Sequence, residues 1–67
     1  MPALNDLPEV IGATVEEAAT ILLPHGINAV RATIIDGRPQ ICTQDMRSDR
    51  LNVSLLAGEI KSLISIR

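Results

Sequence analysis

The chain has 67 residues, of which 46% are hydrophobic and none is Phe, Trp or Tyr, and its formal net charge is −2. That length allows one domain over residues 1–67 and is too short for two separate cores. Domains this small often depend on disulfides or a metal ion. A single cysteine (Cys42) and a single histidine (His25) exclude an intramolecular disulfide and a metal-ligand cluster. The core is therefore expected to consist of aliphatic residues, and their abundance argues against disorder.

The same composition argues against several classes of function. The small negative charge and the absence of aromatic stacking residues argue against a nucleic-acid partner. No apolar run reaches the 18 or so residues of a membrane span. The start at Met1 lacks a basic region followed by an apolar one, so no signal peptide is predicted in this chain, and both a cytoplasmic and a mature secreted form stay open. His25 lies between Pro24 and Gly26, and no nucleophile–base or metal pattern is present, so no enzyme activity and no cofactor are expected.

The first predicted element is a helix over residues 14–23, preceded by an extended lead-in whose first six residues are expected to be flexible. Thr14 and Glu17 have the spacing of a capping box, in which each side chain accepts a hydrogen bond from the other residue's backbone N–H. The apolar residues that follow have helical spacing; they are Val15, Ala18, Ala19 and Leu22. Pro24 and Gly26 then favour an end to the helix.

Three strands are predicted after the helix, over residues 27–35, 51–56 and 60–66. Alternation would place Val30, Ala32 and Ile34 on one face of the first strand, and Leu51, Val53 and Leu55 on one face of the second. A turn at Ala57-Gly58 predicts an antiparallel hairpin of the second and third strands. The first strand follows a helix and can pair in parallel with the second. The predicted fold is therefore α+β, with one α-helix packed on a small mixed β-sheet.

The segment over residues 36–50 shows no clear element and is predicted to be a long exposed loop. Structureless connections of this length are uncommon in compact domains and are usually functional or disordered. The alternative is a second hairpin, because Asp36-Gly37 is a favourable turn pair between the sequences ATII and QICTQ. The pattern alone leaves both interpretations open.

Two stretches of the chain resemble a known family. The sequences PEVIGATVEEAATILL and TQDMRSDRLNV resemble the potato inhibitor I family of serine-protease inhibitors, of the eglin and barley chymotrypsin inhibitor type. The continuation RSDRLNVSLL also resembles a related group of small microbial peptidase inhibitors. The resemblance runs in one collinear order from residue 7 to about residue 60.

The resemblance implies a disulfide-free, reversible, substrate-like inhibitor of serine endopeptidases, subtilisin-like or chymotrypsin-like, and we expect a monomer. It implies that Gln44–Asp45 is the reactive bond in an extended loop. The further protease-contacting residues that it implies are Ile41, Cys42 and Thr43 on the acyl side, and Met46 and Arg47 on the leaving side. The alternative function is a non-inhibitory binding or assembly module of the same fold.

The resemblance also implies that arginines on the strand after the loop support the loop from below. Arg50 matches one such position, and its guanidinium offers five donors for which Thr43 and Asp45 are the expected acceptors. The second supporting position is occupied by Asn52, which is shorter and uncharged. Two alternatives stay open: Arg50 is a solvated surface charge, and Cys42 is either a reactive thiol or a small apolar residue.

Overall fold

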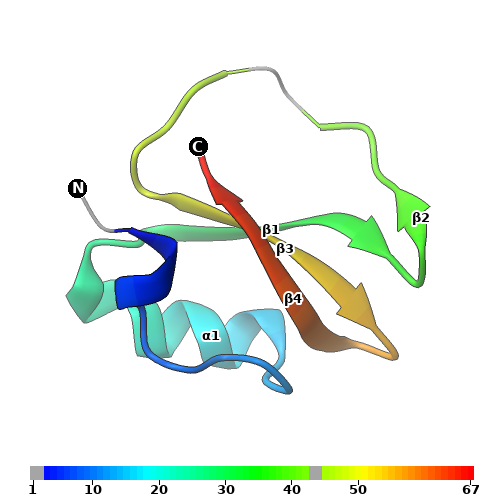
Figure 1. Ribbon diagram of the computed structural model, residues 1–67, viewed down its shortest axis with the longest axis horizontal. Helices are drawn as coiled ribbons and strands as arrows, with labels where there is room; N and C mark the ends of the chain where they lie inside the picture. The colour runs from blue at the N-terminus through cyan, green and yellow to red at the C-terminus, as the bar shows by residue number, and fades with distance from the viewer. Residues whose placement is uncertain (1–2, 43–44) are drawn as a thin grey trace.

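The computed structural model describes residues 3–42 and 45–67. In it a single α-helix, α1 (Val15–Leu22), packs on a four-stranded sheet with the strand order β2-β1-β3-β4 (Figure 1). The strands are β1 (Ala29–Ile35), β2 (Arg38–Pro39), β3 (Arg50–Leu56) and β4 (Glu59–Ile66), and two short 3-10 turns are η1 (Leu4–Asp6) and η2 (Leu23–His25). β1 and β3 are parallel, and the other two pairs are antiparallel. The predicted α+β fold is confirmed.

The helix begins and ends as its sequence predicts. The Thr14 hydroxyl accepts from the Glu17 backbone N–H at 3.1 Å, and the Glu17 carboxylate accepts from the Thr14 backbone N–H at 3.0 Å. The backbone hydrogen bond from Thr14, followed by the bond from its side chain, lowers the pKa of Glu17 below its usual value. At the other end, Gly26 adopts a φ of 87°, a left-handed conformation that glycine accepts without strain.

The core is aliphatic and lies between α1 and the sheet. Its fully buried residues, each at most 1% exposed, are Val10, Ala18, Leu22, Ile27, Leu51, Val53 and Ile60. On β3 the core residues alternate with buried polar residues, because successive side chains of a strand point to opposite faces. The predicted apolar face of β3 is confirmed, with Leu55 packed against the core. The opposite face of β3 carries Arg50, Asn52 and Ser54, and this is the face over which the connection from β2 passes.

The alternative prediction, a hairpin at the start of residues 36–50, is confirmed, but the hairpin of β1 and β2 is short. Asp36 and Gly37 both have positive φ, 50° and 80°, as a two-residue hairpin turn requires. The pairing joins Ile34–Ile35 to β2, so the predicted loop over residues 36–50 is shorter than expected: among its described residues, those without strand structure beyond β2 are 40–42 and 45–49. A second turn of this kind, at Ala57-Gly58, joins β3 to β4 as predicted.

Two details of β1 differ from the prediction. The strand begins at Ala29 and not at Ile27, because the Ile27 N–H donates to the Leu22 carbonyl at the helix end. The parallel register with β3 also shifts between Ala32 and Ile34, so Ile34 is the partner of Ser54. A bulge of this kind offsets the alternation of side chains. Ile34 therefore does not share the core-facing side with Val30, and that prediction is wrong.

Candidate functional site

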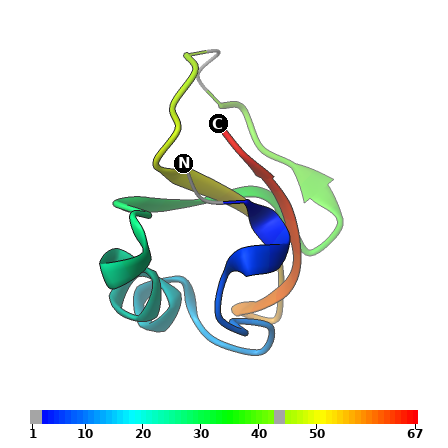
Figure 2. The ribbon, with the colours of Figure 1, turned by 60° about the vertical axis from the view of Figure 1, so that its left-hand side comes forward.

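The described parts of the connection between β2 and β3, residues 40–42 and 45–49, lie across the sheet from the helix. α1 covers one face of the sheet, and these parts of the connection lie over the other in both views (Figures 1 and 2). The topology requires a long connection here, because parallel strands cannot be joined by a tight turn. This segment joins β2 to β3 and so completes the crossover from β1 to its parallel partner β3.

The described residues of this connection include two that are prominent at the surface. Ile41 is fully exposed and Met46 is largely exposed, although both are large apolar side chains. Thr43 and Gln44 lie outside the described residues. The predicted reactive bond Gln44–Asp45 is therefore described only from its Asp45 side.

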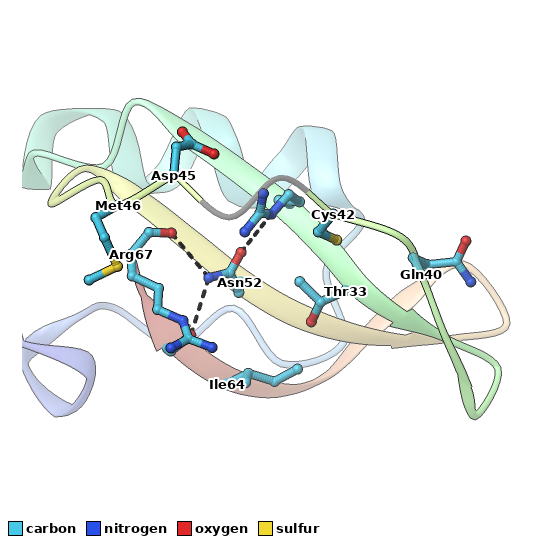
Figure 3. Close-up of a pocket in the computed structure, with 10 residues that line it drawn as sticks. Thr33, Gln40, Cys42, Asp45, Met46, Asn52, Ile64 and Arg67 are labelled. Carbon is cyan, nitrogen blue, oxygen red and sulfur yellow. Dashed lines mark hydrogen bonds between the residues drawn. The ribbon is translucent and has the colours of Figure 1, made fainter.

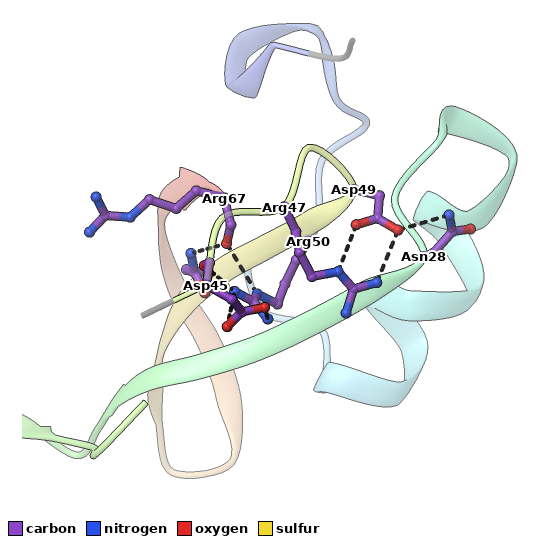
Figure 4. A network of polar contacts seen from close by, with 7 residues as sticks. Asn28, Asp45, Arg47, Asp49, Arg50 and Arg67 are labelled. Carbon is purple, nitrogen blue, oxygen red and sulfur yellow. Dashed lines mark hydrogen bonds and ion pairs between the residues drawn. The ribbon is translucent and has the colours of Figure 1, made fainter. Parts of the chain in front are cut away.

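Arg50, the first residue of β3, joins the connection to the sheet. It is only 6% exposed. Its Nη1 donates to Asp45 Oδ2 at 3.2 Å, and its Nη2 donates to Asp45 Oδ1 at 3.3 Å and to the Asp45 carbonyl at 3.1 Å (Figure 4). Its Nε donates to the Arg67 carbonyl at 3.1 Å. Nε, Nη1 and Nη2 of Arg50 therefore all donate hydrogen bonds within the protein. The alternative interpretation, in which Arg50 is a solvated surface charge, is wrong, and the predicted contact with Asp45 is present. The other predicted acceptor, Thr43, lies outside the described residues.

Asn52 lies two residues further along β3 and is 2% exposed. Its amide Nδ2 donates to Ser65 Oγ at 3.1 Å and to the Arg67 carbonyl at 3.2 Å. Its Oδ1 accepts from Arg31 Nε, on β1, at 2.9 Å. The amide therefore joins β4 to β1 (Figure 3). The Arg67 carbonyl also accepts from Arg50, so Arg50 and Asn52 share this acceptor (Figure 4).

A second polar cluster holds the end of the connection just before β3. Arg47 donates through Nε and Nη2 to the two carboxylate oxygens of Asp49, at 2.9 and 3.0 Å, and Asn28 Nδ2 donates to the same carboxylate at 3.2 Å (Figure 4). These hydrogen bonds, with that from Arg47 the strongest, lower the pKa of Asp49 from 3.8 to about 2, and the Asp49 pairing raises the pKa of Arg47. The Asp49 carbonyl also accepts from the Asn28 backbone N–H at 2.8 Å. The base of the connection is thereby tied to the segment that enters β1.

Between the connection and the sheet lies a half-open cavity of about 250 Å³ (Figure 3). Its floor is formed by residues of β1, β3 and β4, and its roof by the connection; Cys42, Asp45 and Met46 line it from above, and Arg31, Thr33, Asn52 and Ile64 from below. Cys42 is half-buried against this space. The connection is therefore held over the sheet by discrete polar contacts and not by a continuous packed layer.

Sequence reasoning missed three participants in this arrangement. Arg31 and Asn28 lie far from the connection in sequence, and the Arg67 carbonyl is a backbone group that no side-chain pattern marks. The alternation of β1 was a usable signal, because it separates Arg31 and Thr33 from the core-facing Val30. What it could not supply is the register that makes Arg31 the direct partner of Asn52.

Other kinds of site find little support in the described part of the chain. Over residues 3–42 and 45–67, no group of three or more His, Cys, Asp and Glu side chains is placed to hold a metal ion. Among the same residues, no helix has the length and apolar character needed to cross a membrane. Comparison with protein-family models, with curated proteins and with solved structures finds no match. The geometry and chemistry of the connection are thus the basis for inferring a function.

Proposed function

We propose that the protein is a reversible, substrate-like inhibitor of serine endopeptidases of the subtilisin-like or chymotrypsin-like type, which it binds through residues 41–47. The observation that carries the proposal is the set of hydrogen bonds from buried Arg50 to Asp45. An exposed connection whose backbone is tied to a buried arginine can enter a protease cleft as an extended segment without first losing its conformational freedom. Ordering a flexible segment costs about 1–2 kcal/mol per residue, so pre-ordering several residues favours tight binding.

The position of Asp45 gives this proposal a specific mechanism. Cleavage of the Gln44–Asp45 bond, the reactive bond that the resemblance implies, would leave Asp45 as the new amino terminus. Arg50 holds both the carboxylate and the carbonyl of that residue. The new amine would therefore stay beside the acyl-enzyme, where it can attack the ester and restore the peptide bond. Religation then competes with hydrolysis, and the protease stays occupied.

The large side chains at the surface of the connection suit the same role. Ile41 and Met46 lie on either side of the proposed reactive bond and expose apolar surface that the fold itself leaves unburied. Burial of apolar surface on binding contributes about 25 cal/mol per Å², so two such side chains provide a substantial part of an interface. Gln44 in the primary specificity pocket favours proteases with a broad pocket, since an amide gains little in an apolar slot.

One incubation tests the proposal. The protein is mixed with subtilisin and, separately, with chymotrypsin; residual protease activity is followed over hours, and the products are identified by mass spectrometry. We expect stoichiometric loss of activity with slow, partial cutting at Gln44–Asp45. Rapid digestion of the chain with full protease activity would contradict inhibition, and it would favour a binding or assembly module of the same fold.

The role of Arg50 is tested with a matched pair of variants. Arg50→Met keeps much of the aliphatic stem and removes the guanidinium, and Arg38→Met makes the same chemical change at an exposed position on β2. Lost charge-assisted hydrogen bonds cost about 1.5–3 kcal/mol, so we expect Arg50→Met to weaken inhibition about 10- to 100-fold and to speed cleavage. Arg38→Met should behave like the parent chain. Equal inhibition constants for the two variants would refute the bracing by Arg50.

A further inference from the structure

Arg31 is a residue of the strand β1, whereas Arg50 is the first residue of the neighbouring strand β3. Arg31 is half-buried and lines the cavity under the connection together with Cys42. It is also the register partner of Asn52 in the parallel pairing of β1 and β3. Two arginines from two neighbouring strands, Arg31 and Arg50, are therefore placed below one connection.

The orientation of Asn52 is fixed by its surroundings. Both N–H bonds of its amide are used, one on Ser65 Oγ at 3.1 Å and one on the Arg67 carbonyl at 3.2 Å. An amide has two donors on nitrogen and acceptor sites only on oxygen. Oδ1 must therefore point towards β1, where it accepts from Arg31 Nε at 2.9 Å.

This arrangement leaves Asn52 unable to support the connection directly, but well placed to align Arg31. The bond to Asn52 uses the Arg31 Nε, so the two Nη groups of the same guanidinium are not part of that contact. Arg31 also borders the cavity under Cys42. The Thr33 carbonyl, two residues along β1, accepts from the Gln40 backbone N–H at 2.8 Å, so the incoming half of the connection leaves the sheet from the edge of β1.

We propose that Arg31 is a second positioning residue for the connection, aligned by Asn52, and that it orders the acyl-side half, whose last described residues are Ile41 and Cys42. Arg50 orders the leaving-side half through Asp45. The two cations act from different strands, so each half of the connection has its own support. As a statement about inhibition, the assignment rests on the proposed function; as a statement about order in the free protein, it does not.

Backbone dynamics of the free protein test the assignment without any protease. Amide ¹⁵N relaxation is measured at Ile41 and Cys42 on one side and at Asp45 and Met46 on the other. In Arg31→Met we expect the order parameters of Ile41 and Cys42 to fall from about 0.85 towards 0.6. Those of Asp45 and Met46 should stay unchanged. Arg50→Met should give the reverse pattern, and Arg38→Met should change neither side.

A merely structural role for Arg31 predicts a different result. Removal of an ordinary sheet contact would lower the urea midpoint and leave the two halves of the connection equally ordered. That outcome, or unchanged order at Ile41 and Cys42, overturns the assignment. Arg31→Lys tests whether Asn52 aligns Arg31. Lysine keeps the positive charge but has a single nitrogen, which cannot bind Asn52 and reach the connection at the same time. We expect it to loosen the acyl side nearly as much as Arg31→Met, and full order with lysine would refute the alignment by Asn52.

The same variants then connect order to inhibition. If the parent chain inhibits subtilisin, Arg31→Met should be cleaved about tenfold faster at the reactive bond, the factor expected for one charge-assisted hydrogen bond. An unchanged cleavage rate would count against positioning by Arg31 in the complex. If the parent chain does not inhibit but Arg31→Met still loosens only the acyl side, the proposed function fails and the positioning role stands.

Discussion

The two faces of the sheet are held together by different kinds of interaction. On the helix side, Leu22, Leu51 and Ile60 are at most 1% exposed and pack as an aliphatic core. On the other side, Arg50 and Asn52 are almost as deeply buried, but they act through hydrogen bonds with defined donors and acceptors. Those of Arg50 hold the connection at Asp45, and those of Asn52 join β4 to Arg31 on β1. β3 serves both sides, because its residues alternate between them. Apolar packing has little directionality and stabilises the whole fold, whereas the polar contacts fix particular atoms of one segment.

This difference predicts two modes of failure. A cavity in the core should weaken every element together, since small domains unfold cooperatively. A lost donor on the opposite face should loosen a local segment first, because few other contacts hold it there. No buried side-chain nitrogen or oxygen in the described part of the chain lacks a hydrogen-bond partner, so the polar face is fully satisfied as it stands. Removal of one partner there leaves another group desolvated without compensation.

The largest expected effect is in the core. Leu22→Ala removes a fully buried side chain between α1 and the sheet, and comparable substitutions cost about 2–5 kcal/mol. In a domain of this size that is a large part of the total stability. Urea unfolding should show a much lower midpoint, with helix and sheet signals lost together. Ile21→Ala, the exposed neighbour on the same helix, is the control and should have a small effect. Similar midpoints for the two variants would mean that the core is not where the structure puts it.

Asn52→Ala is the corresponding change on the polar face. It removes the acceptor of Arg31 Nε and the donor to the Ser65 hydroxyl, while the Arg67 carbonyl keeps its bond from Arg50, and loss of a partner for a group away from water costs about 1–3 kcal/mol. We expect a smaller fall in the urea midpoint than for Leu22→Ala, together with faster amide hydrogen exchange at Arg67, whose N–H donates to the Arg50 carbonyl.

The control for this contrast is the double variant Ser54→Ala/Ser62→Ala. It removes both partners of a hydroxyl pair in which Ser54 is buried and Ser62 is exposed, and whose oxygens are 2.6 Å apart, and so leaves neither hydroxyl without its partner. Removal of both partners can be nearly neutral. If the double variant is as destabilised as Asn52→Ala, unsatisfied polar groups are not what distinguishes this face.

Interactions between residues close in sequence were the predictable part of this molecule. The capping box of Thr14 and Glu17 spans three residues, and the Ala57-Gly58 turn has a two-residue signature, so each could be identified from the sequence. The parallel pairing of β1 with β3 was allowed by the order of the elements but not required by it, and the structure confirms it.

The polar face was predictable only in part. Arg50 and Asp45 are five residues apart, and a family resemblance pointed to their contact. Arg31 and Asn52 are 21 residues apart, as are Asn28 and Asp49, and both contacts depend on the register of a parallel pair that contains a bulge. No local pattern encodes that register. Asn52 consequently looked like a weakened support, whereas in the structure its amide makes three hydrogen bonds.

The helix cap allows a sharper comparison, because it is a polar contact on the apolar side of the sheet. Thr14→Ala removes the side chain that accepts from the Glu17 N–H, a change that typically costs about 1 kcal/mol. We expect a modest fall in the melting temperature and no change in the amide order of Asp45 or Met46. Thr20→Ala, on the same helix, is the matched control, since its hydroxyl only donates back to the Glu16 carbonyl. Loosening of the connection by Thr14→Ala would show that the two sides are not independent.

The smallest expected effect concerns acid and the base of the connection. The pKa of Asp49 is about 2 in the folded protein and 3.8 as the reference value, so between these values the unfolded state binds more protons. The Asp49 contribution to stability is therefore complete above pH 3.8 and is lost as the pH falls towards 2. The carboxylate and Arg47 are partly exposed, and water competes for such a pair, so we expect a slight loss confined to this end of the connection.

An NMR titration from pH 6 to pH 2 measures this directly, through the Asp49 carboxylate and the Asn28 side-chain amide that donates to it. Glu17 also titrates in the acid range with a lowered pKa, so the parent chain is compared with Asp49→Asn, which keeps Glu17 and removes only the Asp49 titration. We expect the Asn28 amide to shift with an apparent pKa near 2 in the parent and to be flat in the variant. A midpoint near 3.8 would mean that Arg47 and Asn28 do not hold Asp49 in solution. The base of the connection would then be tied to the segment that enters β1 through the bond from the Asn28 backbone N–H to the Asp49 carbonyl, which does not depend on the carboxylate.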